Sequence, residues 1–334
     1  MKKILAMFLI ALMILGLAAC AGKPTDAAVK TGLGIVFSNS NSKDPADGKD
    51  GTIDSQAYVA AVTVDKDGKV VKCVIDAMQS KFTFTTGSEI KTTADTVFKS
   101  KNELGNDYGM KKASKIQKEW FEQAAAFAAY CVGKTSDQIK NIAVTEGVAT
   151  DADLKSSVTV RIATFQDAVT KAIANAADVG AKASDKLGLA IEGAATQTQT
   201  LAKDGKPATA VAYNYYTATT FDANGKITSC IIDASQGKFV VENGKITTDL
   251  NAEIKTKNEL GDAYGMKKAS KIQKEWNEQA AAFAKFAVGK TVADVKGISL
   301  TEGAPSAGTD LASSVTVHVT SFINIIEKAA GTAK

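Results

Sequence analysis

The chain contains 334 residues, with 40 lysines and arginines against 36 aspartates and glutamates, which gives a formal net charge of +4. A chain of this length can bury two sizeable hydrophobic cores. Arg161 is the single arginine, and no basic cluster with interleaved aromatic residues is present in the sequence, which argues against nucleic acid as a partner.

Residues 1–19 have the pattern of an export signal. Lys2 and Lys3 precede an apolar run over residues 4–17 that is short for a membrane span, and small residues then lead to Cys20. With a cysteine at the first mature position, the segment is similar to a bacterial lipoprotein signal, in which that thiol takes a diacylglycerol and the chain is cut before it. We therefore expect residues 20–29 to be a lipidated tether at the outer face of the cell membrane, an ordinary signal peptide being the alternative.

One long segment occurs twice in the chain. Residues 101–135 and 257–291 are identical at 29 of 35 aligned positions, at an offset of 156 residues. A repeat unit of this length indicates two globular domains and not a short-period solenoid. We predict a first domain over residues 30–176, a linker over residues 177–183, and a second domain over residues 184–330.

Alternating β-branched residues predict strands at the start of each domain. In the first domain, residues 57–64 and 70–75 flank an Asp-Gly turn, which is typical of a hairpin, and residues 81–86 predict a third strand. The matching strands of the second domain are expected over residues 210–221, 226–232 and 238–242.

A helix is predicted in the middle of each domain. Ser114 and Gln117 have the spacing of a capping box, Trp120 and Phe127 fall on one apolar face, and Gly133 ends the pattern. The second domain repeats this arrangement with Ser270, Gln273, Trp276, Phe283 and Gly289. We interpret the two tryptophans as core residues rather than as platforms for a planar ligand.

The last part of each domain is expected to add one strand and one helix. The strand is predicted over residues 158–162 and 315–319, and the first domain then closes with a helix over residues 165–175 that Thr164 caps. Each domain is therefore predicted to be α+β, with a small mixed sheet, a capped central helix and a C-terminal helix.

Residues that usually carry catalysis are scarce. His318 has Arg161 as its counterpart, so the two domains share no histidine-based triad or general base. Glu103, Glu119 and Glu122 recur in the second domain as Glu259, Glu275 and Glu278. Glu119 and Glu122 are predicted to lie in a lysine-rich helix, so we interpret them as a solvated helix face with ion pairs and not as a catalytic dyad. With no recognisable hydrolase, metalloprotease or nucleotide-binding motif in the sequence, we predict that the chain is not an enzyme.

The cysteines after Cys20 do not have metal-site spacing. Cys73 and Cys230 occupy matching places in the two domains, whereas Cys131 has an alanine as its counterpart. No CxxC pair exists, and three cysteines remain, so we predict buried free thiols and no metal site.

A Tyr-Gly-Met loop precedes each central helix, at residues 108–110 and 264–266. Loops concentrate binding residues, so these side chains are candidates for lining a pocket. Packing of the loop against its own helix is an equally good interpretation.

A segment rich in hydroxyl groups lies near the end of each domain. Asp153, Ser156 and Thr159 mark it in the first domain. By residue type alone it is a turn that leads into a strand, with its polar side chains bonded to the turn backbone. The matching residues of the second domain are Asp310, Ser313 and Thr316.

The same segment resembles the attachment motif of the FMN-binding domain family, Asp-x-x-Ser-Gly-Ala-Thr followed by a helix with Ala-Val-x-x-Ala. Residues 168–172 supply the Ala-Val-x-x-Ala pattern here, while Ser157 and Val158 stand at the Gly and Ala positions. The duplicated layout, the lipoprotein signal and the repeated Glu-Leu-Gly and Tyr-Gly-Met blocks are similar to two-domain flavinylated lipoproteins of Gram-positive extracellular electron transfer.

That resemblance implies two covalently attached FMN groups per chain, joined by a flavin transferase through a phosphoester to Thr159 and Thr316. Asp153, Ser156, Asp310 and Ser313 are then expected at the cofactor sites. The implied function is a lipid-anchored electron carrier between a membrane NADH dehydrogenase or the quinone pool and extracellular acceptors. Some members of this group also release a pheromone peptide from the signal segment, which corresponds here to residues 11–19.

Two other functions remain open from the residues. The first is a surface protein that binds a small ligand through the Tyr-Gly-Met loops and holds no flavin. The second is a structural or adhesive envelope lipoprotein, which the high content of alanine, threonine and lysine fits equally well.

Overall fold

The computed structural model describes residues 26–334, so the predicted export signal and Cys20 lie outside the described residues. In the first half, the strands are β1 (Lys30–Ser38), β2 (Gly51–Val64), β3 (Val70–Phe84), β4 (Val97–Phe98), β5 (Val144–Thr145) and β6 (Val148–Ala149). The helices there are α2 (Lys101–Leu104), the 3₁₀ turn η1 (Gly105–Tyr108), α3 (Trp120–Cys131), α4 (Ser136–Lys140), α5 (Ala152–Lys155) and α6 (Ala163–Ala174).

The second half follows the same order of main elements. Its strands are β7 (Lys186–Ala194), β8 (Ala208–Phe221), β9 (Ile227–Glu242), β10 (Lys245–Ile246), β11 (Leu300–Thr301) and β12 (Ala304–Pro305). Its helices are α7 (Lys257–Leu260), η2 (Gly261–Tyr264), α8 (Trp276–Ala287), α9 (Val292–Lys296), η3 (Asp310–Ser313) and α10 (Thr320–Thr332). None of the helices described here combines the length and the apolar character that crossing a bilayer requires.

The mixture of helices and strands agrees with the predicted combination of both structure types. The main strands form one sheet in the order β1-β2-β3 and a second in the order β10-β9-β8-β7-β4. Every pair of named strands is antiparallel, so the predicted mixed sheet is wrong. The physical reason is that successive long strands are joined by hairpins or loops rather than by the helical crossovers that parallel pairing requires.

The strands are longer and differently divided than the sequence predicted. The separate third strand over residues 81–86 is wrong, because β3 runs without a break to Phe84, which pairs with Gly51 at the start of β2. The same holds in the second half, where β9 includes residues 238–242. The first strands, β1 and β7, were not predicted, because their many small residues weaken the alternating pattern.

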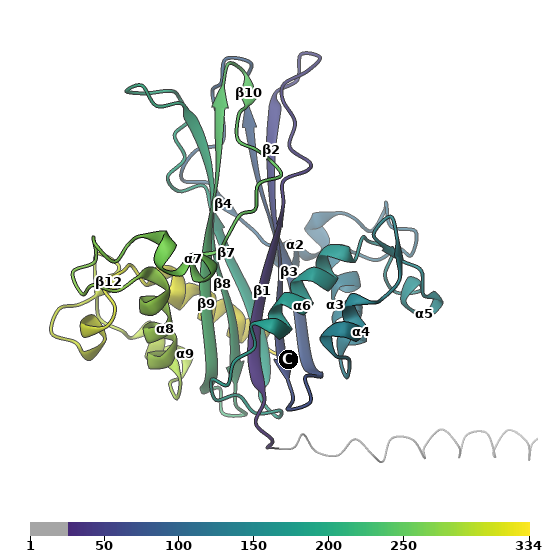
Figure 1. Cartoon of the computed structure of the whole chain (residues 1–334), viewed down its shortest axis with the longest axis vertical. Helices are drawn as coiled ribbons and strands as arrows, with labels where there is room; N and C mark the ends of the chain where they lie inside the picture. Colours follow the sequence, from purple (N-terminus) through teal and green to yellow (C-terminus); the bar gives the residue numbers. More distant parts are fainter. Residues whose placement is uncertain (1–25) are drawn as a thin grey trace, which may run out of the picture.

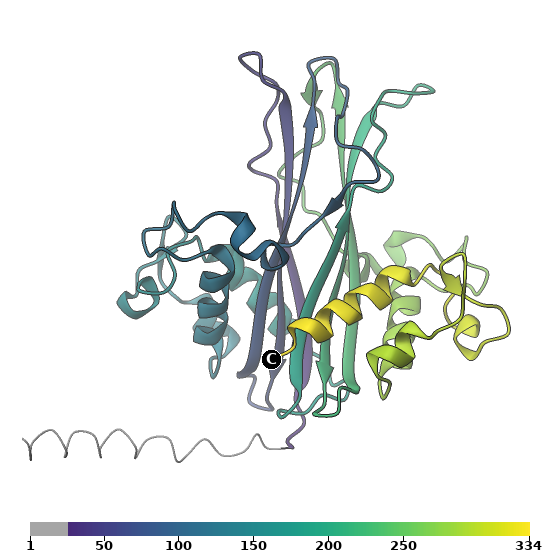
Figure 2. The same ribbon diagram turned by 180° about the vertical axis from the view of Figure 1, so that it is seen from behind.

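The molecule has four layers. Helices α3 and α6 cover the outer face of the β1-β2-β3 sheet, and α8 and α10 cover the outer face of the other sheet. Figure 1 shows the helices as two lobes on opposite flanks of the central strands. Figure 2 shows α10 lying across the strands of the second half, seen from behind.

The inner faces of the two sheets meet in two buried clusters that both halves share. Residues of β1, β2 and β3 meet residues of β7 and β8 in a cluster that is almost fully buried, with Tyr216 as its largest member. The two-residue strand β4 comes from the first half but pairs with β7, so one sheet contains residues of both halves. The two halves therefore pack against each other through their sheets.

Two ion pairs join the halves at matching places. Lys171 of α6 binds Glu259 of α7 with 2.5 Å between Nζ and Oε1, and Lys328 of α10 binds Glu103 of α2 at 2.7 Å. Glu103 and Glu259 therefore each bind a lysine of the other half. All four side chains are about a third exposed or less, so each pair is only partly screened by solvent.

The central helix begins later than predicted. Helix α3 starts at Trp120, and Glu119 is its N-cap residue in a capping box with Glu122. The prediction that Ser114 and Gln117 cap this helix is wrong, because Gln117 has a φ of 53°, a left-handed conformation that interrupts a helix. Gly133 follows the helix with a φ of 79°, as predicted for its end.

The expected strands and helix cap before the C-terminal helices also differ. No strand forms over residues 158–162 or 315–319, and the N-cap residue of α6 is Ile162 rather than Thr164. Thr159 and Val160 donate their backbone N–H groups to a glutamine side chain, described below, so only an isolated antiparallel bridge between Arg161 and Val148 remains of the predicted strand.

Gly32 and Gly188 let the C-terminal helices approach the sheets. A Cβ atom on Gly32 would overlap the carbonyl oxygen of Ala172 in α6, and one on Gly188 would overlap that of Ala329 in α10. Backbone atoms of a packed helix cannot move aside at low cost. The two glycines therefore fix how closely each helix packs on its sheet.

We expect Gly32→Ala and Gly188→Ala each to lower the free energy of unfolding by about 1–3 kcal/mol, because the added methyl group overpacks the helix–sheet contact. Denaturant unfolding followed by circular dichroism measures the change. Gly87→Ala is the control, since a Cβ there meets only the Thr85 hydroxyl oxygen at an ordinary 3.5 Å. Equal stability of Gly32→Ala and the unaltered chain would contradict the close-packing argument.

Candidate functional site

The segment that carries the motif residues is a short turn of helix. Helix α5 is capped by Asp151, whose side chain accepts a 2.9 Å hydrogen bond from the Leu154 N–H. Ser156 Oγ donates to the Asp153 carbonyl at 2.7 Å, while the Asp153 side chain is exposed. In the second half, Ser313 Oγ donates to the Asp310 carbonyl at the same distance.

The residues at the two positions that differ from the FMN-binding motif, Ser157 and Val158 with their counterparts Ser314 and Val315, have structural roles. Val158 and Val315 are fully buried members of the two cores under the helices. Ser157 Oγ donates to the Leu154 carbonyl at 3.2 Å, and Ser314 makes the matching bond to Leu311. These substitutions thus anchor the turn and leave the next residue, Thr159 or Thr316, half-buried at the surface.

Thr159 is held by one buried side chain. Gln123 Oε1, on α3, accepts hydrogen bonds from Thr159 N at 2.8 Å, Thr159 Oγ1 at 3.2 Å and Val160 N at 3.1 Å. In the second half, Gln279 Oε1 accepts the same three bonds from Thr316 and Val317, at 2.8, 3.2 and 3.2 Å. We call this arrangement the glutamine clamp.

The clamp is itself fixed by the loop before the helix. Gln123 Nε2 donates to Ser114 Oγ at 3.1 Å and to the Lys118 carbonyl at 3.2 Å. Ser114 thus orients the clamp instead of capping the helix. Gln279 makes the matching bonds to Ser270 and Lys274.

The Tyr-Gly-Met loop is tied to the same helix. Buried Glu119 accepts from Met110 N at 2.9 Å and from Lys111 N at 3.0 Å. Glu275 makes the corresponding bonds at 2.8 Å each. The interpretation of Glu119 and Glu275 as solvated residues is therefore wrong, because loop amides satisfy their buried carboxylates.

A pocket of about 440 Å³ opens beside Thr159. It brings the motif threonine and the Tyr-Gly-Met loop together, through Thr159 and Met110, while Asp153 and Ser156 do not line it. Its volume lies in the range of ordinary small-molecule sites. The lining residues are Met110, Ala113, Ser114, Lys115, Gln123, Val148, Lys155, Thr159 and Val160.

A buried lysine surrounded by aromatic rings lies at the start of α2 and of α7. Lys257 Nζ is 4.7, 4.6 and 4.8 Å from the ring centroids of Tyr213, Tyr264 and Trp276, and it donates to the Tyr213 hydroxyl at 2.6 Å. Lys101 has a similar cage, formed by Tyr58, Tyr108 and Trp120 at 5.5, 4.9 and 5.0 Å.

These two lysines lose their proton more readily than an exposed lysine does. Burial lowers the pKa of Lys101 and of Lys257 to about 8, while the nearby carboxylates of Asp54 and Asp76 for the first, and Asp233 for the second, act in the opposite direction. Trp120 and Trp276 are buried in the cores, in agreement with their interpretation as core residues, but they also form one wall of each cage.

Sequence reasoning missed the glutamine clamp and the lysine cages. The sequence contained one indication of both features, because Gln123, Lys101 and their counterparts are identical in the two repeated segments. A recurring glutamine or lysine inside a helical pattern gave no indication of what it touches, however, since its partners come from distant parts of the chain.

Other candidate groups lie apart from this site. Within residues 26–334, no cluster of histidine, cysteine and acidic side chains has the arrangement of a metal site, and Cys73, Cys131 and Cys230 are free thiols. Cys131 and Cys230 are buried, as predicted, whereas Cys73 is only partly buried.

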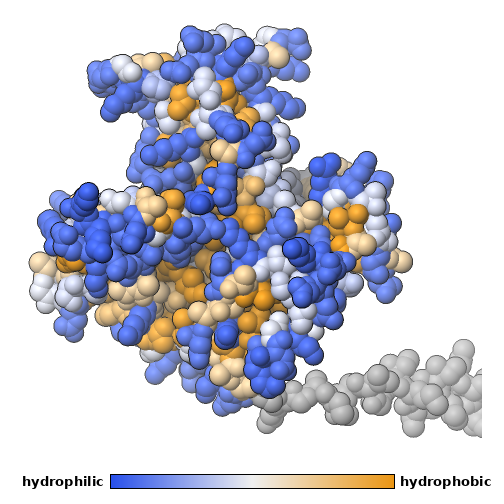
Figure 3. Space-filling view, in the orientation of Figure 1, coloured by the Kyte–Doolittle hydropathy of each residue, from blue (hydrophilic) through white to orange (hydrophobic). Residues whose placement is uncertain are grey.

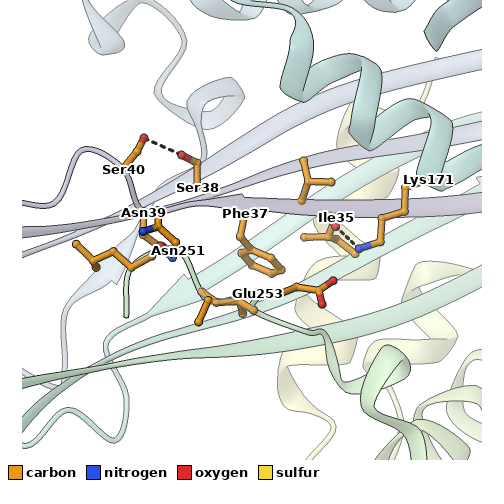
Figure 4. A pocket seen from close by; sticks show the side chains of 12 residues that line it. Ile35, Phe37, Ser38, Asn39, Ser40, Lys171, Asn251 and Glu253 are labelled. Carbon is orange, nitrogen blue, oxygen red and sulfur yellow. Dashed lines mark hydrogen bonds between the residues drawn. The ribbon is translucent and has the colours of Figure 1, made fainter. Parts of the chain in front are cut away.

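A second pocket, of about 370 Å³, lies at the seam of the two halves. Figure 4 shows Lys171 there, with its ammonium group bonded to the Ile35 carbonyl at 2.8 Å, and Phe37 and Glu253 nearby. None of the predicted cofactor residues lines this pocket.

We expect Gln123→Ala to destabilise the chain by about 1–3 kcal/mol, since three donors lose their acceptor. The amides of Thr159 and Val160 should also exchange with solvent faster. Hydrogen exchange followed by mass spectrometry and denaturant unfolding measure the two effects, with a change of exposed Lys112 to alanine as the control. Unchanged exchange at both amides would show that the clamp does not hold this segment.

We expect the lysine cage to make stability rise with pH. The folded chain releases the Lys257 proton near pH 8, whereas the unfolded chain keeps it until about the ordinary pKa of 10.5. The unfolded state therefore holds more protons between these values, and stability should increase through this window. The free energy of unfolding, taken relative to Lys257→Met, should rise between pH 8 and 10 by up to about 1.4 kcal/mol per pH unit.

Chemical denaturation at a series of pH values measures this difference. Lys245→Met is the matched control, because Lys245 is exposed. A pH-independent difference between the unaltered chain and Lys257→Met would contradict a lowered lysine pKa.

In the comparisons with known proteins, no family model, no curated protein and no solved structure matches this chain.

Proposed function

We propose that the chain is a lipid-anchored electron carrier that holds one FMN covalently on Thr159 and one on Thr316. The observation that carries the proposal is the glutamine clamp, which places a threonine hydroxyl in the same half-buried setting in both halves. Two such settings in one chain are the reason to propose two tandem copies of one FMN-binding domain.

The clamp fits a modified threonine. Of the three groups that bind Gln123 Oε1, two are backbone N–H groups, which remain free to bind after the hydroxyl hydrogen is replaced by the FMN phosphate. Thr159 Oγ1 would lose one 3.2 Å hydrogen bond and no more. The turn can therefore keep its shape in both forms of the protein.

The pocket beside Thr159 also fits the chemical parts of FMN. Lys115 and Lys155 line it and can balance the negative charge of a phosphodiester. Met110, Val148 and Val160 supply apolar and polarisable walls for a flat ring system. In the second half, Ala312 replaces Lys155, so the phosphate there would have one lysine fewer in its surroundings.

When bound, FMN supplies the redox chemistry, since its ring accepts and donates one or two electrons. The residues of the chain provide the point of attachment, the orientation and the electrostatic surroundings. This role needs no general base or nucleophile of the protein's own, which is consistent with the prediction that the chain is not an enzyme.

The proposed setting is the outer face of the cell membrane, where Cys20 would carry the lipid anchor. A covalent bond keeps a cofactor that would otherwise be lost by dilution outside the cell. The proposed partners are a flavin transferase, a membrane NADH dehydrogenase or the quinone pool as electron source, and extracellular acceptors.

A flavin-free binding protein is the second candidate. It is favoured by the position of Met110, because the Tyr-Gly-Met loop lines a pocket whether or not Thr159 is modified. Such a protein would bind its ligand reversibly and would leave both threonines unchanged.

The proposal predicts two FMN phosphoester adducts per chain. The protein should be produced with an active flavin transferase and measured as intact mass, followed by peptide mapping. Thr159→Ala and Thr316→Ala should each remove one adduct, and the double variant should remove both, because no hydroxyl oxygen is left to carry the phosphate.

Thr159→Ser combined with Thr316→Ala is the matched control, because serine keeps the hydroxyl and should keep one adduct. Unmodified threonines in cells whose transferase modifies another substrate would reject the proposal and leave the flavin-free candidate. Adducts on other residues would reject the assignment of the sites.

A further inference from the structure

A loop rich in lysine precedes the central helix of each half. It spans residues 110–118 in the first half and residues 266–274 in the second, and neither segment contains an acidic residue. We call these segments the lysine loops. In both, the first three lysines are exposed and the fourth is half-buried. The lysines are Lys111, Lys112, Lys115 and Lys118 in the first loop, and Lys267, Lys268, Lys271 and Lys274 in the second.

The positive charges of these loops are not neutralised by acidic side chains. Within the part of the chain that the structure describes, no lysine of the loops forms an ion pair, whereas Lys91, for example, binds Asp50. The next acidic residue along the chain, Glu119, is buried, and its carboxylate accepts hydrogen bonds from the N–H groups of Met110 and Lys111. The exposed surface of the loop is therefore positive.

Other exposed loops of the chain mix the two signs of charge. The loop after β1 contains Lys43 and Lys49 together with three aspartates, and the loop after β7 contains Lys203 and Lys206 on either side of Asp204. Ordinary surfaces intersperse charges in this way, because like charges that are held together repel each other. A partner of opposite charge would relieve the repulsion within the lysine loops.

Hydrogen bonds hold the backbone of the lysine loop in one shape. The N–H groups of Ala113 and Ser114 both donate to the Met110 carbonyl, at 2.9 and 3.0 Å. The Gln117 N–H donates to the Ser114 carbonyl at 3.0 Å, and the same three bonds occur at the same distances in the second half. A partner therefore meets an ordered backbone, and binding costs less conformational entropy than binding to a flexible loop.

The two lysine loops are identical, although exposed positions close to them differ. Residues 109–120 and 265–276 have the same sequence at every position. Three residues before the first loop, exposed Asp107 has Ala263 as its counterpart. Both halves thus present the same arrangement of positive charges.

Each loop lies beside a clamped threonine. Ser114 and Ser270 of the loops bind the glutamines that hold Thr159 and Thr316, and Lys115 lines the pocket that opens beside Thr159. The helices that follow the loops, α3 and α8, lie on opposite flanks of the sheets (Figure 1), and Figure 3 shows hydrophilic residues over much of both helical lobes. A flat membrane surface can face only one flank, whereas a protein can dock on either.

We propose that each lysine loop is a docking surface for a protein that carries an acidic patch, and that docking brings this protein close to Thr159 or Thr316. The inference rests on the proposed function only in identifying the docked protein as one that exchanges electrons with the flavin. The docking itself depends on charge complementarity and needs no flavin. Charges of this kind act mainly on the rate of association and on its dependence on salt.

The test uses a short, fluorescently labelled oligoglutamate peptide as a model of an acidic protein surface. It is titrated into the mature chain, produced without a flavin transferase, and fluorescence anisotropy is measured from about 10 mM salt, where the screening length is about 30 Å, upwards. We expect saturable binding at two sites per chain that weakens as salt is added. At low salt, binding should weaken about tenfold in the variant that combines Lys111→Gln, Lys112→Gln, Lys267→Gln and Lys268→Gln.

The matched control removes the same number of charges from the loops of mixed sign. It should weaken binding far less, because those lysines lie among aspartates. Circular dichroism verifies that both variants are folded. The control variant combines Lys43→Gln, Lys49→Gln, Lys203→Gln and Lys206→Gln, all at exposed positions.

Three results would overturn the docking proposal. They are an absence of saturable oligoglutamate binding, equal losses of affinity in the two variants, and stronger binding to phosphatidylglycerol vesicles than to oligoglutamate, which would assign the loops to a membrane surface. Because the titrated chain carries no flavin, these results do not depend on whether the threonines can be modified. Unmodified threonines in the mass measurement would reject the flavin sites and leave the docking result standing.

Discussion

The burial of one sheet face against the other is the constraint on which the rest of the structure depends. Each half has a sheet whose outer face is covered by two helices, and its inner face carries apolar side chains such as Leu33, Val59 and Leu189. Exposed to water, that face would be a large apolar patch. The opposing sheet removes it from water, and the ion pairs at Lys171 and Lys328 then fix the orientation in which the halves meet.

The parts of the fold that local sequence controls were predictable. The Asp-Gly turn gave the hairpin of β2 and β3, and Gly133 marked the end of α3, because turn chemistry depends on adjacent residues. The start of α3 was misplaced for the opposite reason. Ser114 has the sequence features of a cap, but Glu119 binds the loop amides of Met110 and Lys111 and so sets the true first turn. Such a competition between two caps is decided by tertiary contacts.

Some residues of the candidate site could likewise be predicted from local sequence, and others could not. Thr159 and Thr316 were identified from the spacing of a short motif, and Met110 from its place in a recurring loop. Gln123 was not, because its three bonds reach residues 36 and 37 positions away in the chain. Lys101 was missed since a lysine is normally assigned to the surface, and only the packing of aromatic rings from three separate segments accounts for its burial. Contacts of this kind have no signature in local periodicity.

The position of the two lobes has a consequence for how such a chain works. Thr159 is bonded to α3 and Thr316 to α8, and these helices lie on opposite flanks of two stacked sheets. The rate of electron tunnelling falls exponentially with distance. Redox groups on the two threonines, as proposed above, would therefore each exchange electrons with a partner independently of the other. A docked protein can reach only one flank at a time. Exchange of electrons with both proposed groups would then require two separate encounters, one on each flank.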